Sequence, residues 1–334
     1  MTLATCFRVA LPLLLWAVAC ARAGEPEPAS PRDCDSPGFA TTLLAATQPD
    51  IVPARAHWLD RRLIRWPGVA GEGRFRLHHA RHATLVVIPG KPVEGADAVI
   101  ELSRFSQALP PVLAKRFGFV APGSTLAVAA TDLDRIPSLL GGQLLLVRED
   151  SRGNVLDVTA LQVAGALDDL YAAAEDLVLG VEAKAASTTF TLWAPTAQSV
   201  ALCLHDARDD TAVTLRHAHR DPETGTWSLR IDRDLSGGYY TWLVDVFVPG
   251  SGILRNRMTD PYSISLDTDS RHSWIGNLDA PTSKPDGWDD APLPPGLAAQ
   301  TDMAIYELHV RDFSTSDRSV PAADRGKYLA FTHA

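Results

Sequence analysis

The chain has 334 residues and a formal net charge of −9 at pH 7, with 46% hydrophobic and 21% charged residues. This length predicts two or three domains, and the composition is typical of a folded globular protein. The acidic balance argues against a surface that binds phosphate groups, so we expect no nucleic-acid partner.

The N-terminus has the pattern of a secretory signal peptide. Arg8 is the only charged residue among the first 20, and residues 9–19 form an apolar run. That run is shorter than the roughly 20 residues of a membrane-spanning helix. With the small-residue site AlaArgAla at 21–23, it predicts a signal peptide over residues 1–23 and a secreted or periplasmic protein. Alternatively, residues 17–20 (AVAC) form a lipobox, with Cys20 lipidated and the protein a lipoprotein at the cell surface.

Residues 24–50 form a proline-rich leader, and we expect its acidic first part, residues 24–38, to be extended or disordered. After cleavage the chain retains Cys34 in this leader and Cys203 within a predicted strand. The spacing implies no disulfide framework, so we expect two unpaired thiols and no cysteine-based metal site. No phosphate-binding glycine motif is present, and we predict no cofactor.

Residues 51–178 alternate short β-like runs with turns such as Pro67-Gly68 and Pro89-Gly90. This pattern predicts a β-sandwich with helical insertions, and residues 110–117 and 164–176 are the best helix candidates. The second has apolar Leu167, Leu170 and Tyr171 at helical spacing.

A second β-unit is predicted over residues 187–278, where seven short strands can be placed. Their ranges are 188–194, 199–206, 212–218, 226–231, 239–248, 253–258 and 262–266. Seven strands within about 100 residues are typical of an immunoglobulin-like sandwich. Apolar residues alternate along three of them, which predicts that Trp227 and Trp242 point into the core.

The remaining segments are a proline-rich linker, residues 279–300, and a terminal part, residues 301–334. Residues 303–310 (MAIYELHV) are a nearly continuous apolar run. Such a run is typical of a strand that is buried on both faces of a parallel sheet.

Several sequence segments resemble known families. Residues 190–200 (FTLWAPTAQSV), 225–227 (GTW), 238–242 (GYYTW) and 260–263 (DPYS) resemble a family-48 carbohydrate-binding module. Residues 55–58 (RAHW), 63–66 (LIRW), 109–117 and 165–171 resemble the N-terminal domain of pullulanases and limit dextrinases in glycoside hydrolase family 13. Residues 303–314 are similar to the opening of their catalytic barrel, so 301–334 would be its truncated start and contain only the first strand of a (β/α)8 barrel.

The resemblance implies the N-terminal portion of an exported pullulanase-type α-1,6-glucosidase, a starch-debranching hydrolase. The intact enzyme would hydrolyse α-1,6 branches in pullulan, glycogen or amylopectin fragments with retention, using two carboxylates about 5 Å apart. A complete barrel takes about 250 residues, so we assign no catalytic residue and expect this chain to be inactive. The alternatives are a stand-alone α-glucan-binding protein and a fragment of an isoamylase- or branching-type enzyme.

Aromatic residues are the candidates for glucan contact, because sugar-binding modules stack flat rings on pyranose faces. Trp193 and Tyr239 alternate with the aliphatic residues of their strands, so their side chains are predicted to point outward when the aliphatic ones point into the core. We therefore predict that Trp193 and Tyr239 bind glucan. The pair His217 and His219 is interpreted as part of an exposed basic strand rather than a metal site, since no third ligand has suitable spacing.

Overall fold

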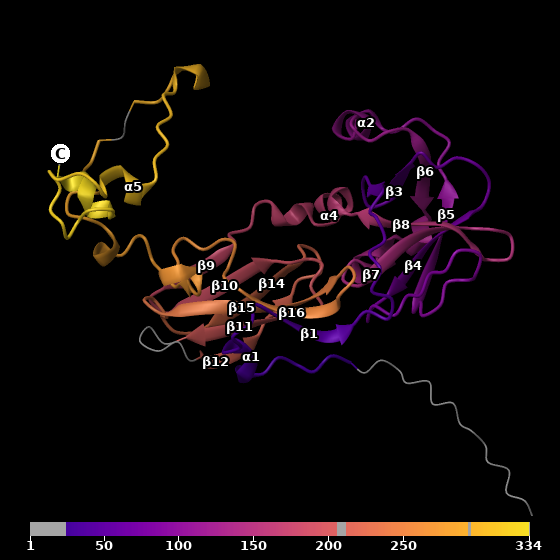
Figure 1. The fold of residues 1–334 in the computed structure, drawn as a ribbon, viewed down its shortest axis with the longest axis horizontal. Helices are drawn as coiled ribbons and strands as arrows, with labels where there is room; N and C mark the ends of the chain where they lie inside the picture. The colour runs from indigo at the N-terminus through magenta and orange to yellow at the C-terminus, as the bar shows by residue number, and fades with distance from the viewer. Residues whose placement is uncertain (1–24, 206–211, 293–294, 334) are drawn as a thin grey trace, which may run out of the picture. The chain divides into compact units, whose positions relative to one another are not determined.

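The structure is a computed structural model that describes residues 25–205, 212–292 and 295–333. Two compact units are present, one ending at Leu278 and the other beginning at Asp279 (Figure 1). The predicted signal peptide, including Cys20, lies outside the described residues. In the described part of the chain, no helix combines the length and the apolar character needed to cross a membrane.

The first β-domain is a closed seven-stranded barrel with the strand order β2-β3-β6-β5-β4-β7-β8. Its strands are β2 (Ala56–Trp58), β3 (Leu63–Pro67), β4 (Arg74–Ala80), β5 (Ala98–Arg104), β6 (Gly123–Val128), β7 (Gln143–Glu149) and β8 (Val155–Gln162). Six neighbouring pairs are antiparallel, and the parallel pairing of Ala56 with Leu161 joins β2 to β8. The mainly β character is confirmed, but these strands close into a barrel rather than a two-sheet sandwich. Short strands with regular turns suit both architectures, and only the long-range β2–β8 pairing separates them.

Short helices connect and cover the barrel strands. They are α2 (Pro111–Arg116), η1 (Ala130–Arg135), α3 (Ile136–Leu139), α4 (Ala164–Leu170) and η2 (Ala172–Ala174), so helices occur in both predicted regions. The barrel core is filled by large side chains, among them Trp58, Trp66 and Phe75. Leu167 and Leu170 of α4 pack against this core, as expected from their helical spacing.

The second β-domain is a sandwich of two sheets. One sheet has the order β1-β16-β15-β11-β12, with β17 also paired to β15, and the other has the order β13-β14-β10-β9. The strands are β1 (Ala40–Ala45), β9 (Gly180–Lys184), β10 (Ser187–Trp193), β11 (Ser199–His205), β12 (Ala212–His217), β13 (His219–Arg220), β14 (Thr226–Ile231), β15 (Tyr239–Val248), β16 (Gly252–Met258) and β17 (Ser273–Trp274). Six of the seven predicted strands are present. The seventh, at 262–266, is not a strand, and β17 pairs with β15 instead.

The sandwich core forms where the inward residues of the two sheets meet. Trp242 is fully buried and Trp227 is nearly so, which confirms the prediction for both. Phe190 of β10 makes edge-to-face contacts with Tyr240 and Trp242 of β15, with ring centroids 5.0 and 6.4 Å apart. Such contacts between the sheets stabilise the sandwich beyond the burial of area alone.

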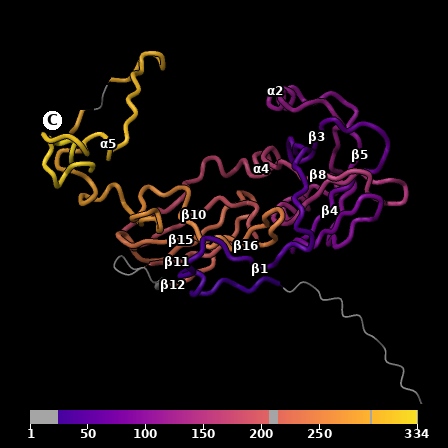
Figure 2. The backbone as a smooth tube through the Cα atoms, in the orientation of Figure 1, coloured from indigo at the N-terminus to yellow at the C-terminus, as the bar shows by residue number. Residues whose placement is uncertain are grey.

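The leader is folded, and this includes residues 31–34, which lie within the part expected to be extended or disordered. Its strand β1 pairs antiparallel with β16, and the two strands run side by side in Figure 2. Helix α1 (Pro31–Cys34) begins after Ser30, whose backbone N–H donates to the Asp33 carboxylate at 2.7 Å. Proline at the first helical position and a serine N-cap favour this short turn, although the surrounding composition suggests disorder.

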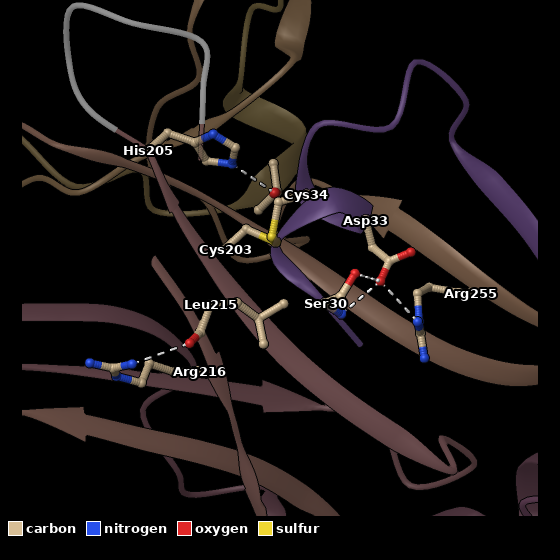
Figure 3. Close-up of a disulfide and its surroundings, with 9 residues drawn as sticks. Ser30, Asp33, Cys34, Cys203, His205, Leu215, Arg216 and Arg255 are labelled. Carbon is tan, nitrogen blue, oxygen red and sulfur yellow. Dashed lines mark hydrogen bonds and ion pairs between the residues drawn. A yellow bond between two sulfur atoms is a disulfide. The ribbon is translucent and has the colours of Figure 1, made fainter. Parts of the chain in front are cut away.

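A disulfide joins Cys34 to Cys203 of β11, so the expectation of two unpaired thiols is wrong (Figure 3). The two residues are 169 positions apart in sequence, and both are buried with Ala201 and Leu243 on the outer face of the larger sheet. Arg255 fixes the same leader segment through Asp33 at 3.1 Å and the carbonyl of Glu27 at 2.8 Å. Sequence spacing cannot reveal this pairing, because it depends on how the leader folds onto the sheet.

The unit that begins at Asp279 has little regular structure. It contains η4 (Pro281–Ser283), η5 (Gln300–Asp302), α5 (Val310–Ser314) and η6 (Tyr328–Thr332). The strand expected at residues 303–310 is absent: residues 303–309 have no regular secondary structure, Val310 begins α5, and Ile305 is 83% exposed. A strand of a parallel sheet needs hydrogen-bonded neighbours, and no described strand in this unit provides them. Phe313 and Phe331 stack with ring centroids 4.6 Å apart.

Candidate functional site

Trp193 is the last residue of β10 and lies on the outer face of its sheet. Phe190 and Leu192 of the same strand are buried in the sandwich core, whereas Trp193 is half-buried and packs against the hydrophobic cluster of the barrel. Its indole Nε1–H donates to the carbonyl of Thr224 at 3.1 Å. The ring is therefore held in one orientation, and its outward position agrees with the parity expected from the sequence.

Trp193 lines a hollow of about 570 Å³ between the sandwich and the barrel, which we call the Trp193 groove. The barrel side contributes side chains from α2 and α4, and the chain connecting the two domains runs along the groove. The side chains that define its chemistry are two further aromatic residues, one cation and two acids: Tyr171, Tyr262, Arg116, Asp168 and Glu175. Flat apolar surface with a few polar groups is the usual lining of a small-molecule site.

Tyr262 enters the groove from the segment that follows β16. Its backbone N–H donates to Asp260 at 2.8 Å. Gly180 lies beside it with φ of +88°, and a Cβ at that glycine would come within 3.1 Å of Tyr262. Burial, and to a lesser extent the nearby Asp260 carboxylate, raises the pKa of Tyr262. The phenol therefore remains protonated at neutral pH and can donate a hydrogen bond.

Asp260 is the buried acceptor that organises this end of the sandwich. Its Oδ2 accepts from the Tyr240 hydroxyl and from Trp242 Nε1, both at 2.9 Å, while its Oδ1 accepts from Tyr262. Only 3% of Asp260 is exposed. Burial, followed by the Asp260 charge, raises the pKa of Tyr240 far above its ordinary value, so its hydroxyl remains a donor.

The barrel side of the groove carries an ion pair between Arg116 of α2 and Asp168 of α4. Both side chains are 49% exposed, so they remain accessible from solvent. Asp169, the next residue, instead binds Arg61 at 2.8 Å. Successive residues of a helix do not face the same way, and the adjacent acids 168 and 169 thus belong to two different ion pairs.

Tyr239, the other predicted glucan-binding residue, begins β15 and pairs with His205 and Trp274 on neighbouring strands. It is half-buried on the outer face of the larger sheet, because Tyr240 beside it points into the core. Its ring lies 6.5 Å from that of His272. Trp193 belongs to the smaller sheet, so the structure does not bring the two predicted residues into one site.

The two histidines at 217 and 219 are divided between the two sheets. His217 ends β12, His219 begins β13, and the buried Ala218 marks the crossing between them. Both histidines are exposed. They do not share a strand face, which is consistent with their interpretation as exposed basic positions.

Sequence reasoning missed the groove residues on the barrel side. Arg116 and Asp168 lie within the two predicted helices but are 52 positions apart, and no sequence pattern links them. The helical apolar spacing that includes Tyr171 gives no sign of a role for its hydroxyl. That hydroxyl accepts from Arg220 of the sandwich at 3.0 Å, a contact that exists only once both domains have folded.

Comparisons with known proteins identify the family of each domain. The sequence matches the Pullulanase N2 domain over residues 53–169 and carbohydrate-binding module 48 (isoamylase N-terminal domain) over residues 178–263. The curated relatives include a pullulanase of Klebsiella pneumoniae, 34% identical over 286 residues, which cover 84% of this chain and 25% of the relative. Pullulanase 1, chloroplastic, of Arabidopsis thaliana is also 34% identical, over 84% of this chain and 29% of its own length.

Solved structures agree with the sequence relatives. Apo pullulanase from Klebsiella pneumoniae matches with a TM-score of 0.74 and 32% identity over 85% of this chain and 30% of that structure. The same pullulanase complexed with maltotriose matches with a TM-score of 0.75 and 32% identity, over 85% of this chain and 27% of that structure. The chain thus spans about a quarter of the length of the curated relatives named here. Residues 53–169 thus form a Pullulanase N2 domain, and residues 178–263 form a family-48 carbohydrate-binding module.

Proposed function

We propose that this chain is the glucan-binding N-terminal portion of an exported pullulanase-type α-1,6-glucosidase. The whole enzyme would hydrolyse α-1,6 branches in pullulan, glycogen or amylopectin fragments with retention of configuration. The observation that carries the proposal is the succession of an N2 domain and a family-48 module, shared with relatives that are named pullulanases. In this proposal the module is an immunoglobulin-like sandwich that holds the polysaccharide, and these 334 residues alone release no reducing sugar.

Two features support α-glucan binding. The Trp193 groove combines aromatic surface with hydrogen-bonding side chains, which suits the flat, hydroxyl-rich faces of a sugar. A similar solved pullulanase is described as complexed with maltotriose. We assign Trp193 the role of a stacking surface, and Tyr239 that of a second, separate contact.

Affinity electrophoresis of the purified chain in gels containing glycogen or pullulan tests this assignment. The wild-type chain should migrate more slowly in the presence of glucan, and Trp193→Ala should be retarded less. Trp288→Ala is the matched control, because Trp288 is 62% exposed and lies in the unit that begins at Asp279. Unchanged migration of the wild-type chain would refute glucan binding, and release of reducing sugar by these residues would refute their inactivity.

Export is supported by the Cys34–Cys203 disulfide, since such bonds persist in oxidising compartments and are rare in a reducing cytosol. We propose cleavage after Ala23, with lipidation of Cys20 as the alternative. Fractionation of expressing cells, together with mass spectrometry of the mature N-terminus, distinguishes these routes. A full-length chain that remains in the cytosol would contradict export.

A further inference from the structure

We propose that the N2 barrel takes part in glucan binding directly, because the ion pair of Arg116 and Asp168 binds the hydroxyl groups of a glucosyl unit stacked on Trp193. This inference rests on the proposed glucan binding and adds a binding role for the barrel. The site is composite. The sandwich contributes Trp193 and Tyr262 to the lining as a flat surface, and the barrel contributes Arg116 and Asp168 as a polar wall.

The flat surface is arranged before a ligand arrives. The hydrogen bond to Thr224 holds the Trp193 indole, and the side chain also packs against the barrel cluster. Tyr262 is positioned through its backbone by Asp260 and by its close approach to Gly180. A surface that is already ordered loses little conformational freedom on binding, which favours affinity.

The spacing between the two walls is also fixed. Gln198 of the sandwich donates to the carbonyls of Arg81 and Gly141 of the barrel at 2.7 and 2.9 Å. Arg220 of the sandwich donates to the Tyr171 hydroxyl, at the junction of the two domains. These bonds hold the two domains together, so Arg116 and Trp193 keep a fixed spacing in the groove.

The polar wall has the chemistry of a neutral sugar site. A guanidinium donates hydrogen bonds and a carboxylate accepts them. The pair can therefore donate to one sugar hydroxyl and accept from its neighbour. Arg116 also lies over the Phe117 ring, with its guanidinium carbon 5.3 Å from the ring centroid, which limits its freedom. Its charge is balanced by Asp168, and Glu175 adds a further negative charge. With the Arg116 charge neutralised and one further carboxylate present, the groove disfavours anionic ligands and suits an uncharged polysaccharide.

The test measures dissociation constants for maltoheptaose by isothermal titration calorimetry, using the complete chain. We expect Arg116→Ala and Asp168→Asn each to weaken binding about three- to tenfold, the loss typical of one or two hydrogen bonds. Asp169→Asn is the matched control, because Asp169 is the next residue of α4 and pairs with Arg61. It should bind within about twofold of wild type, the precision of the comparison. Circular dichroism melting curves of all variants establish that they remain folded.

Three outcomes separate the inference from the function on which it rests. Weakened binding by Arg116→Ala and Asp168→Asn, with Asp169→Asn unchanged, supports a contribution from the barrel. Wild-type affinity in both groove variants, with weakened binding in Trp193→Ala, would overturn that contribution and leave glucan binding by the sandwich intact. No heat of binding for the wild-type chain, and no retardation in glucan gels, would reject the proposed function itself.

Discussion

Asp260 shows how one buried side chain can organise a site without reaching it. It accepts hydrogen bonds from Tyr240 and Trp242 in the core and from the backbone of Tyr262 at the groove. A carboxylate can serve three donors, whereas an amide replaces one of its acceptor oxygens with a donor. The sequence segment at 260–263 marks this position, but only the folded sandwich brings these partners together.

We therefore expect Asp260→Asn to lower the free energy of unfolding by about 1–3 kcal/mol, since at least one buried donor loses its acceptor. Urea denaturation followed by tryptophan fluorescence measures the change. Asp232→Asn is the control, because the side chain of Asp232 is 85% exposed, and it should unfold as wild type does. Equal stabilities of the two variants would show that the Asp260 hydrogen bonds contribute nothing.

His78 of β4 is a second buried polar residue, within the barrel. Its Nε2 lies 2.7 Å from the Glu149 carboxylate, which also accepts from Arg76 at 3.1 Å. Burial lowers the pKa of His78 from its ordinary value and outweighs the opposing effect of the Glu149 hydrogen bond and charge, while the positive charge of Arg76 adds to the lowering. Because Arg76 already balances Glu149, the histidine is stable as a neutral donor.

This environment predicts a fall in stability at mildly acidic pH. Below about pH 6.5 the unfolded chain binds a proton at His78 while the folded chain does not, so protonation favours unfolding. Protonation of His78 can lower the free energy of unfolding by at most about 1.4 kcal/mol per pH unit. Urea unfolding at pH 7.5 and 5.5 should show a smaller fall for His78→Gln than for wild type. His219 is exposed, so the control His219→Gln should show the same fall in the free energy of unfolding between pH 7.5 and 5.5 as wild type. If His78→Gln also showed the wild-type fall, His78 would not be the source of the pH dependence.

At the scale of elements, the leader is a structural part of the sandwich. Strand β1 extends the larger sheet by pairing with β16, and the disulfide covers a small apolar cluster on the outer face. Arg255 is 4% exposed and contacts Asp33, Glu27 and Asp245, so its charge is balanced where it is buried. Without these contacts the edge of β16 would be open to pairing with other chains.

Reduction of the Cys34–Cys203 disulfide should lower the free energy of unfolding by about 2–5 kcal/mol, because the bond closes a long loop in the unfolded chain. Urea denaturation with and without dithiothreitol measures this effect. The double variant Cys34→Ser with Cys203→Ser should show the same loss and no further response to the reductant. If reduction left the wild-type midpoint unchanged, the bond would have no stabilising role.

Local patterns predicted most of the strands and both helical regions, because alternation and helical spacing are properties of neighbouring residues. Three features that depend on distant partners were not predictable in this way. The barrel closes through β2 and β8, the leader folds through Cys203 and Arg255, and the groove pairs Arg116 with Asp168. Alternation along one strand is enough to predict the outward position of Trp193. The polar wall of Arg116 and Asp168 belongs to the other domain, so no local sequence pattern links it to Trp193.

At the scale of the whole molecule, the barrel and the sandwich are joined through small, closely fitted contacts. Gly225, in the turn before β14, has φ of +67°, and a Cβ there would come within 2.8 Å of Pro195 and 2.9 Å of the Tyr171 ring. Tyr171 is 2% exposed and belongs to the barrel cluster. The absence of a side chain at Gly225 is therefore what allows Tyr171 to lie between the two domains.

Gly225→Ala should therefore weaken the junction, whereas Gly237→Ala separates this effect from backbone strain. Gly237 has a similar φ of +87°, but a Cβ added there would meet no heavy atom within 4 Å, so its substitution introduces strain alone. We expect Gly237→Ala to cost about 1 kcal/mol and Gly225→Ala about 1–3 kcal/mol more, because the methyl group displaces Tyr171. Differential scanning calorimetry should resolve separate barrel and sandwich transitions in Gly225→Ala and a more cooperative transition in Gly237→Ala. Indistinguishable melting profiles would mean that the two domains are coupled elsewhere, through contacts such as those of Gln198 with Arg81 and Gly141.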